Sequence, residues 1–202
     1  MKGTALKKVV AALLLALLLT LSCRRTAQTP SAPEVTDDST AAPAATAEAP
    51  AAYAFPFTAK TLEGETMTEA VLGQYDLTMV NVWASWCGPC RSELGELAEL
   101  YGKLPENVGF LSVTVDEAGD LDDAKALLEE NGCSFPSLDG QGSEGLMNGF
   151  LRRITAIPTT LFLDRSGNQV GQWIVGVPQG GGSVADAYMS EIQARLDLLN
   201  GK

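Results

Sequence analysis

The sequence predicts an α/β domain with a central mixed sheet flanked by helices, and three observations support this fold class. Residues 77–83 (LTMVNVW) and 108–115 (VGFLSVTV) are almost continuous apolar runs, as expected for strands buried on both faces. Residues 92–104 between them carry apolar side chains at helical spacing, so the order favours a right-handed parallel crossover. Residues 159–164 and 169–175 flank a short turn and indicate an antiparallel hairpin. A sheet that contains both units is mixed.

The remaining elements surround this sheet. Residues 57–61 and 65–68 predict a hairpin added before the first buried strand. Asp120 can cap a helix that Asn131-Gly132 ends, and a last helix spans about residues 184–199. The apolar faces of the three helices comprise Leu94, Leu97, Leu100, Tyr101 and Leu104 in the first, Leu121, Ala124, Leu127 and Leu128 in the second, and Tyr188, Ile192, Leu196 and Leu199 in the third.

Residues 1–22 have the pattern of a secretory signal. Three lysines precede the apolar run 9–21, which is too short to span a membrane comfortably. Ser22-Cys23 resembles the lipobox of bacterial lipoproteins, although Thr20 stands where Leu is usual. The resemblance implies cleavage before Cys23, lipid on its sulfur, and an extracytoplasmic domain held at the membrane. An uncleaved or differently cleaved anchor is the alternative.

Residues 23–52 predict a disordered tether between this anchor and the domain 53–202. Residues 24–52 contain ten Ala, four Pro, five Thr and two Ser, and too few large apolar side chains to form a core. A flexible coil of this length reaches roughly 30 Å. The predicted domain itself carries 9 basic and 21 acidic residues, a net charge of -12. This acidity disfavours binding to nucleic acid.

The chain has no histidine and four cysteines. The absence of histidine excludes Ser-His-Asp and Cys-His catalysis and every zinc site with a histidine ligand. With Cys23 in the targeting signal, four cysteines are too few for an all-cysteine zinc or iron–sulfur site within one mature chain. The remaining cysteines point to thiol chemistry instead.

Cys87 and Cys90 belong to a Cys-Gly-Pro-Cys motif that follows the strand 77–83 and opens the helix. A cysteine at a helix N-terminus meets unpaired backbone N–H groups and the positive end of the helix dipole, which favour the thiolate. Cys87 has this position and is the expected nucleophile. Cys90 lies one turn further in, where it can attack a mixed disulfide at Cys87. Pro89 is tolerated in the first turn and stiffens the loop.

Half of a zinc site and a purely structural disulfide are the two other interpretations of this pair. A zinc site is disfavoured because two further ligands are needed: no other C-x-x-C exists, and Cys133 supplies at most a third ligand. A purely structural disulfide is the remaining alternative. It is disfavoured because the strand-to-helix placement, with Trp86 before the first cysteine, is expected of a redox site. No metal and no cofactor are therefore expected.

Residues 83–90 (WASWCGPC) and 155–160 (TAIPTT) resemble the thioredoxin superfamily, and within it the membrane-tethered extracytoplasmic reductases of the TlpA and ResA type. The resemblance covers about residues 55–200. It implies a thioredoxin-like fold with an added N-terminal β-hairpin and a central insertion, and a cis Ile157–Pro158 bond that faces the cysteines. The alternative for this proline is a trans loop residue. The residues then expected to contact the substrate are Trp86, Gly88, Pro89, Ile157 and Pro158.

Asn81 departs from the thioredoxin pattern, in which a buried Asp usually stands six residues before the first active-site cysteine. An amide cannot relay a proton as a carboxylate does. Glu93 falls on the same helical face as Cys90 and matches the acidic position of ResA-like proteins. Glu93 is therefore expected to accept or hold the proton of Cys90 as a catalytic residue. The alternative is a solvated glutamate on a helix that also carries Glu96 and Glu99.

These features predict a thiol–disulfide oxidoreductase acting on disulfides of exported proteins. Gly-Pro between the cysteines resembles thioredoxin, whose potential of about -270 mV lies well below the value of about -120 mV for oxidants of the DsbA kind. This favours a reductase. The compartment is oxidising, so a reductase needs electrons from across the membrane, and the resemblance implies a CcdA-like or DsbD-like membrane donor. Cytochrome c maturation is a role of relatives, which makes apocytochrome c a candidate substrate.

An oxidase or isomerase is the alternative within this class, and a non-catalytic binding lipoprotein is the alternative outside it. A peroxidase is disfavoured because the residues before Cys87 lack a P-x-x-x-T/S-x-x-C pattern.

Residues 140–145 (GQGSEG) satisfy a dinucleotide fingerprint, but the proline in residues 134–138 and the short helix that follows disfavour a Rossmann site. Cys133 is expected to be a half-buried small residue and not a third redox partner.

Overall fold

The computed structural model describes residue 54 and residues 56–201. The predicted signal peptide (1–22), the lipidation site Cys23 and the tether (23–52) lie outside the described residues. Among the described helices, none has the length and apolar character to cross a membrane. The elements are β1 (Thr58–Lys60), β2 (Thr66–Thr68), η1 (Glu69–Gln74), β3 (Leu77–Trp83), α2 (Gly88–Tyr101), β4 (Val108–Thr114), α3 (Leu121–Glu130), β5 (Ser137–Asp139), α4 (Glu144–Asn148), η2 (Leu151–Arg153), β6 (Thr159–Asp164), β7 (Ile174–Val175) and α5 (Val184–Leu199).

Five strands form the central sheet in the order β5-β4-β3-β6-β7. The strands β3, β4 and β5 are parallel, whereas β6 runs antiparallel to β3 and β7 antiparallel to β6. The strands β1 and β2 form a separate antiparallel pair. The predicted mixed sheet and N-terminal hairpin are therefore confirmed.

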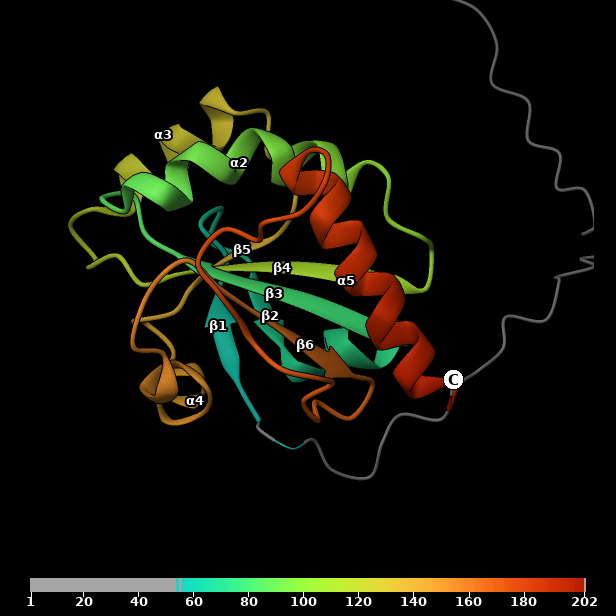
Figure 1. Ribbon diagram of the computed structural model, residues 1–202. Coiled ribbons are helices and arrows are strands. Elements are labelled where there is room, and N and C mark those ends of the chain that lie inside the picture. Colours follow the sequence, from blue (N-terminus) through green and yellow to red (C-terminus); the bar gives the residue numbers. More distant parts are fainter. Residues whose placement is uncertain (1–53, 55, 202) are drawn as a thin grey trace, which may run out of the picture. The chain divides into compact units, whose positions relative to one another are not determined.

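The sheet separates two apolar cores. The helices α2 and α5 lie on one face, whereas β1, β2 and α4 lie on the other (Figure 1). Side chains alternate along β3, so Leu77 and Met79 pack toward the helices, and Val80 and Val82 pack toward the other face. Asn81 lies two residues after Met79 and so points to the same face of the sheet as Leu77 and Met79. It therefore faces α2, the helix that the cysteine motif opens.

The three predicted helices are present, with differences at their ends. The helix α2 begins at Gly88 and ends at Tyr101, before the predicted end, because Pro105 disfavours helical backbone in the residue that precedes it. Asp120 stands at the N-cap of α3, but its side chain makes no capping hydrogen bond. Leu199 was predicted to be buried and is 41% exposed, because it is the last residue of α5.

Sequence reasoning missed the short edge strand β5. Pro136 precedes this strand and argues against it in the sequence. The carbonyl of Pro136 nevertheless accepts a hydrogen bond from the Ser112 N–H of β4 at 2.9 Å. Proline lacks a backbone N–H, but at the start of an edge strand no neighbouring strand requires that donor.

The predicted antiparallel hairpin is present, but its return strand over residues 169–175 is shorter than predicted. Only its last two residues form β7, and Gln169 makes an isolated bridge to β6. Gly171 adopts a left-handed backbone with φ +71°, and Arg195 Nη2 donates to the Gln172 carbonyl at 2.9 Å. These contacts hold the middle of the segment out of the ladder.

Candidate active site

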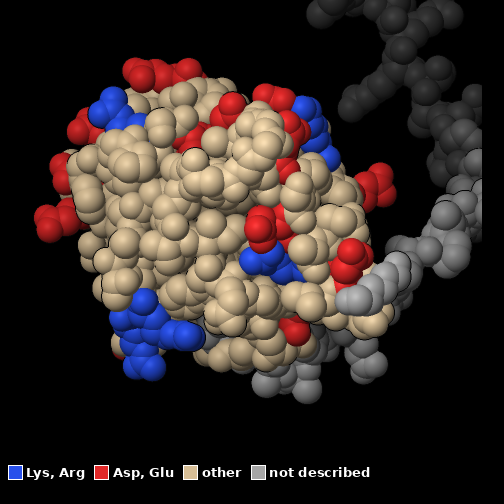
Figure 2. All heavy atoms as spheres, viewed as in Figure 1, with Lys and Arg blue, Asp and Glu red and all other residues tan. Residues whose placement is uncertain are grey.

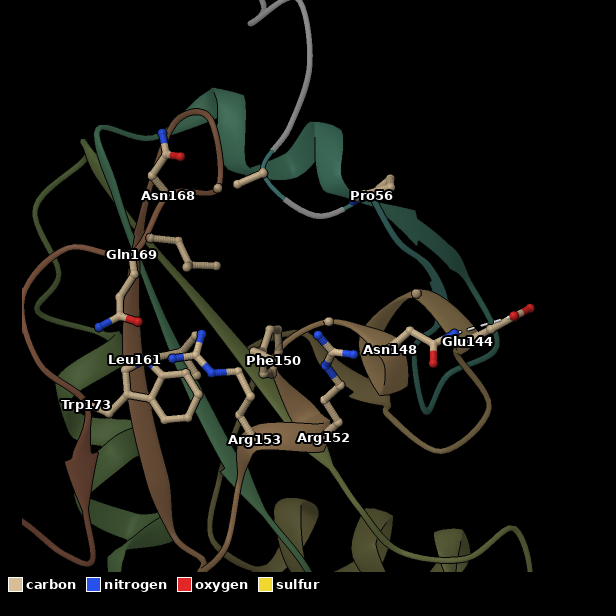
Figure 3. Close-up of a pocket in the computed structure, with 15 residues that line it drawn as sticks. Pro56, Glu144, Asn148, Phe150, Arg152, Arg153, Leu161, Asn168, Gln169 and Trp173 are labelled. Atoms are coloured by element: carbon tan, nitrogen blue, oxygen red, sulfur yellow. Dashed lines mark hydrogen bonds between the residues drawn. The ribbon is translucent and has the colours of Figure 1, made fainter.

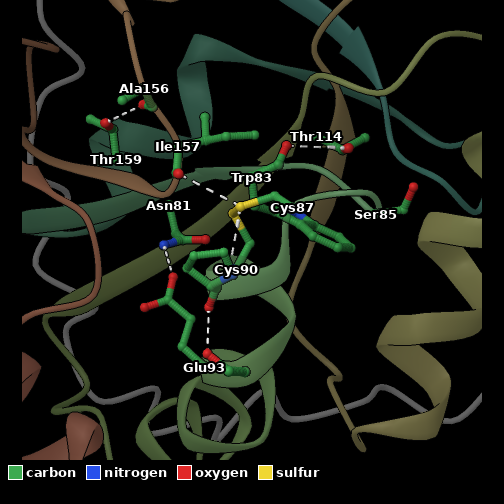
Figure 4. Close-up of a disulfide and its surroundings, with 12 residues drawn as sticks. Asn81, Trp83, Ser85, Cys87, Cys90, Glu93, Thr114, Ala156, Ile157 and Thr159 are labelled. Atoms are coloured by element: carbon green, nitrogen blue, oxygen red, sulfur yellow. Dashed lines mark hydrogen bonds between the residues drawn. A yellow bond between two sulfur atoms is a disulfide. The ribbon is translucent and has the colours of Figure 1, made fainter.

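Cys87 and Cys90 form a disulfide at the N-terminus of α2, with sulfurs 2.04 Å apart (Figure 4). The strand β3 ends at Trp83, so only a short loop separates the sheet from Cys87. Cys87 is 6% exposed, whereas Cys90 is fully buried. An incoming thiol or disulfide therefore reaches Cys87 first.

Two groups lie against the Cys87 sulfur. The Cys90 backbone N–H donates to Cys87 Sγ at 3.3 Å, so the sulfur occupies the N-cap acceptor position of α2. The Ile157 carbonyl oxygen lies 3.6 Å from the same sulfur (Figure 4). A disulfide sulfur carries no proton. In this oxidised state, the Ile157 carbonyl and Cys87 Sγ are therefore in contact but not hydrogen-bonded. A reduced Cys87 thiol would have this carbonyl as its acceptor, and a thiolate would keep the N–H donor.

The loop that faces the disulfide is held by the start of β6 and by β7. The Ile157–Pro158 peptide bond is cis, as the resemblance implies. Thr159 Oγ1 donates to the Ala156 carbonyl at 2.7 Å, and the Gly176 N–H donates to the Pro158 carbonyl at 2.8 Å. These bonds fix the loop so that its backbone lies beside Cys87.

Glu93 is buried beneath the disulfide, with 1% of its surface exposed. The alternative of a solvated glutamate is therefore wrong. Asn81 Nδ2 donates to Glu93 Oε1 at 3.0 Å, and the Tyr188 hydroxyl donates to Oε2 at 3.0 Å. Desolvation raises the pKa of Glu93 to about 7, against the opposing effect of these two hydrogen bonds. The carboxyl group thus changes charge near neutral pH.

Thr160 and Tyr188 complete the network around this carboxylate. Thr160 Oγ1 accepts from Asn81 Nδ2 at 3.1 Å and lies 3.1 Å from the Tyr188 hydroxyl. Burial, and then the nearby Glu93 carboxylate, raise the pKa of Tyr188, so its hydroxyl keeps its proton. Sequence reasoning placed Tyr188 only in the core. A buried tyrosine usually finds a hydrogen-bond partner, but this contact spans 95 residues and no motif indicates it.

Residues 50–173, more than half of the chain, match the AhpC/TSA family. The chain belongs to the AhpC/TSA family.

Curated relatives of this AhpC/TSA member carry the names of thiol–disulfide exchange proteins. The DsbE homolog of Paracoccus denitrificans, a thiol:disulfide interchange protein, is 36% identical over 110 residues, which cover 53% of this chain and 56% of that protein. The sporulation thiol-disulfide oxidoreductase A of Bacillus subtilis is 32% identical over 114 residues, covering 55% and 66%. ResA of Bacillus anthracis is 29% identical over 96 residues, covering 47% and 53%. The chain thus spans half to two-thirds of these relatives.

Solved structures agree in fold. A thioredoxin-family thiol:disulfide interchange protein from Chlorobium tepidum superposes with a TM-score of 0.57 at 25% identity, covering 74% of this chain and 99% of that one. StoA from Bacillus subtilis superposes with a TM-score of 0.52 at 25% identity, covering 68% and 96%. The thioredoxin-like fold and the resemblance to the ResA type are confirmed.

The other predicted substrate residues of this AhpC/TSA member gather around Cys87. Gly88 and Pro89 are exposed, and Trp86 is 66% exposed beside them. Trp86 and Ile157 line a groove of about 280 Å³ whose further walls are largely apolar. The structure therefore brings Trp86, Gly88, Pro89 and Ile157 to one open surface beside Cys87, whereas the side chain of Pro158, also predicted to contact the substrate, is buried.

Asp116 holds the loop that precedes Cys87, and sequence reasoning missed it. The fully buried carboxylate accepts hydrogen bonds from the Ser85 N–H at 2.9 Å and from Ser85 Oγ at 2.7 Å. Thr114 Oγ1 also donates to it. Asp116 follows β4 and lies 31 residues from Ser85, so only the parallel pairing of β3 and β4 brings the two together.

Two further sequence features have structural explanations. Cys133 is half-buried, as expected, and burial raises the pKa of its thiol to about 11. A Cβ on Gly140 would lie 2.6 Å from the Thr114 carbonyl, and one on Gly145 would lie 2.6 Å from the Pro56 carbonyl. These glycines permit close packing around the five-residue helix α4. In residues 56–201, no three His, Cys, Asp or Glu side chains are grouped to hold a metal.

Proposed function

We propose that this chain is a membrane-tethered, extracytoplasmic thiol–disulfide oxidoreductase that reduces disulfides of exported proteins. The observation that carries the proposal is the Cys87–Cys90 disulfide at a helix N-terminus, beside the cis Ile157–Pro158 loop. Relatives named for thiol–disulfide exchange support the reaction class.

The first step starts from the reduced pair. The Cys87 thiolate attacks one sulfur of the substrate disulfide, so a new S–S bond forms at Cys87 and the substrate S–S bond breaks. The leaving substrate sulfur departs as a thiolate and takes a proton from solvent. The Cys90 N–H and the N-terminus of α2 stabilise the attacking thiolate. The exposed surface of Trp86, Gly88 and Pro89 leaves Cys87 open to a polypeptide substrate.

Cys90 resolves the mixed disulfide. The Glu93 carboxylate, one helical turn away, takes the Cys90 thiol proton, and the resulting thiolate attacks Cys87 Sγ. The Cys87–substrate bond breaks, and the second substrate sulfur leaves and is protonated. Two electrons have then passed from the protein pair to the substrate. A Glu93 pKa of about 7 suits a base that works near neutral pH.

The anchor and the electron donor complete the proposal. The predicted signal (1–22), lipid on Cys23 and the tether (23–52) would hold the domain within roughly 30 Å of a membrane. A CcdA-like or DsbD-like membrane dithiol would then re-reduce the Cys87–Cys90 disulfide. Apocytochrome c is a candidate among exported substrates.

The reduction potential of the Cys87–Cys90 pair tests the direction. Equilibration of the full chain with dithiothreitol buffers is expected to give a value near that of thioredoxin, about -270 mV. A value near about -120 mV would contradict the reductase and favour an oxidase. Replacing both cysteines by Ser must abolish the reduction of a model disulfide. If cells that carry this Cys87→Ser, Cys90→Ser variant kept the function of the wild-type protein, a non-catalytic binding lipoprotein would be favoured instead.

A further inference from the structure

Asp116 is a fully buried acidic residue that takes no part in the proton and sulfur transfers described above. Figure 2 shows acidic side chains spread over one face of the protein, where water solvates them. Among residues 56–201, the charged side chains that are buried belong to Glu93, Asp116 and Arg195. Burial of a charge is costly unless polar groups compensate it. The surroundings of Asp116 therefore decide what this charge does.

Each hydrogen bond to the Asp116 carboxylate in the described chain comes from a neutral donor. The Ser85 N–H reaches both oxygens, at 3.1 and 2.9 Å, and Ser85 Oγ donates to Oδ1 at 2.7 Å. Thr114 Oγ1 donates to Oδ2, and it accepts in turn from the Asp116 N–H at 3.2 Å. An ionised carboxylate only accepts hydrogen bonds, so this arrangement suits the anion.

No ion pair balances this charge in the part of the chain that the structure describes. None of the three ion pairs there includes Asp116. Arg152 and Arg153 of η2 line a separate cavity of about 700 Å³, together with Trp173 (Figure 3). The Arg153 guanidinium lies 4.7 Å from the centre of the Trp173 ring. The field of the Asp116 carboxylate therefore acts on the groups around it without a paired cation.

The Cys87 sulfur lies close to this charge. Ser85 precedes Cys87 by two residues (Figure 4), and the Cys87 N–H donates to the Ala84 carbonyl at 3.1 Å, so the segment forms a turn. From the dimensions of a peptide unit, the Asp116 carboxylate lies within roughly 12 Å of Cys87 Sγ. At an effective dielectric constant of about 20, one charge at that distance changes the ionisation of another group about tenfold. Water at the open surface screens part of this, so about threefold or more is expected.

The sign of the effect favours the oxidised pair. The Cys90 N–H and the N-terminus of α2 stabilise the Cys87 thiolate, and Asp116 opposes them. Among the other charged groups near the motif, Glu93 is buried beneath Cys90, whereas Arg91 and Glu117 are exposed.

This sign has a consequence for the reduction potential. Reduction of the Cys87–Cys90 disulfide by a dithiol takes two electrons and one proton, breaks the S–S bond, and yields a Cys87 thiolate and a Cys90 thiol. A charge that destabilises the thiolate disfavours this reduced form, so the pair becomes a stronger reductant.

We propose that Asp116 is a positioning residue with two effects on the redox pair. Through Ser85 it fixes the loop that precedes Cys87, and its buried charge keeps the Cys87–Cys90 pair reducing. The direction of this effect matters because the proposal rests on the proposed reductase function. The two can fail separately: a wild-type potential near about -120 mV refutes the reductase, whereas the role of Asp116 is judged by differences between variants.

The test compares the full chain with its Asp116→Asn variant. Asparagine keeps an acceptor oxygen for the Ser85 N–H, and its amide can donate to a hydroxyl, so the fold should persist. Loss of the charge should lower by about 0.5 the pH at which alkylation of Cys87 by iodoacetamide is half-maximal, a threefold change in thiol ionisation. Peptide mass spectrometry follows Cys87 separately from the other cysteines. Equilibration with dithiothreitol at pH 8 should favour the reduced variant about threefold, which raises the potential by about 14 mV.

Two further variants separate charge from packing. Ser85→Ala keeps the Asp116 charge but loses a contact, so it should slow the attack of Cys87 on a model disulfide and leave the potential within about 5 mV of wild type. Glu117→Gln removes an exposed acid beside Asp116 and is the matched control, expected to change neither.

Equal potentials of Asp116→Asn and Glu117→Gln would refute the charge effect. A potential of Ser85→Ala raised by about 14 mV would refute it too, even if Asp116→Asn did not fold. A wild-type rate of attack in Ser85→Ala would refute the positioning effect.

Discussion

Glu93→Gln removes a carboxylate whose ionisation destabilises the folded protein. Burial raises the pKa of Glu93 from 4.5 to about 7, so the folded chain holds this proton more tightly than the unfolded chain. Stability is therefore intact below about pH 4.5 and decreases as the pH rises through about 7. At 1.36 kcal/mol per pKa unit, the loss amounts to about 3 kcal/mol at higher pH. Glutamine cannot ionise, so the variant should not show this loss.

The assay is the free energy of unfolding of the oxidised proteins in urea, measured from about pH 4.5 to about pH 8. Glutamine retains an acceptor oxygen for Asn81 or Tyr188, so the variant should fold. Its stability relative to wild type is expected to increase with pH by about 3 kcal/mol. Glu99→Gln, on the exposed side of the same helix, should follow the wild-type pH dependence. Parallel curves for wild type and Glu93→Gln would refute the buried titration.

The same substitution tests the proposed proton transfer in the reduced protein. A carboxylate near a thiol disfavours the thiolate, so Glu93→Gln should lower the apparent pKa of the thiol pair. It should also slow the resolving attack by Cys90 more than the initial attack by Cys87, because the base is lost. Thiolate absorbance and stopped-flow kinetics measure the two effects. If the thiolate titration curves of reduced wild type and Glu93→Gln superimpose, Glu93 has only a structural role.

Three further substitutions test the resolving cysteine, the donor to Glu93 and the predicted anchor. Cys90→Ser should accumulate mixed disulfides at Cys87, detected by non-reducing mass spectrometry; trapping through Cys90 in Cys87→Ser would reverse the roles. Tyr188→Phe removes a donor to Glu93 and should cost about 1–3 kcal/mol above pH 7, with a further rise in the pKa of Glu93, measured by carboxyl NMR titration. Cys23→Ala should abolish lipid labelling and leave an unprocessed precursor; an unmodified soluble N-terminus in wild type would contradict the anchor.

Much of the fold could be predicted because its central elements are encoded locally. The strand β3 coincides with the predicted range 77–83 and α5 with 184–199, since continuous apolar runs and helical spacing are properties of neighbouring residues. The strands β5 and β7 could not be predicted in this way. β5 exists through its pairing with β4, and β7 is cut short where Arg195 of α5 binds the Gln172 carbonyl.

The same division applies to the site. Cys87 is the N-cap of α2, and Cys90 and Glu93 lie in its first turns, so the motif, the helical spacing and the family resemblance together predicted that they meet. Tyr188 and Asp116 reach the site from other elements, through contacts across 95 and 31 residues. No local pattern distinguishes either side chain from an ordinary core tyrosine or loop aspartate.

The network beneath the disulfide explains why an amide stands at position 81. The alternation of β3 directs Asn81 toward α2, where its Nδ2 lies 3.0 Å from Glu93 Oε1 and 3.1 Å from Thr160 Oγ1. A second carboxylate at that distance would compete with Glu93 for one proton, because two like charges so close do not both ionise. With the acid on the helix, the strand position is best filled by a donor that does not titrate. In this network Glu93 is then the group that exchanges a proton near neutral pH. It lies one helical turn from Cys90, whose sulfur must lose its proton.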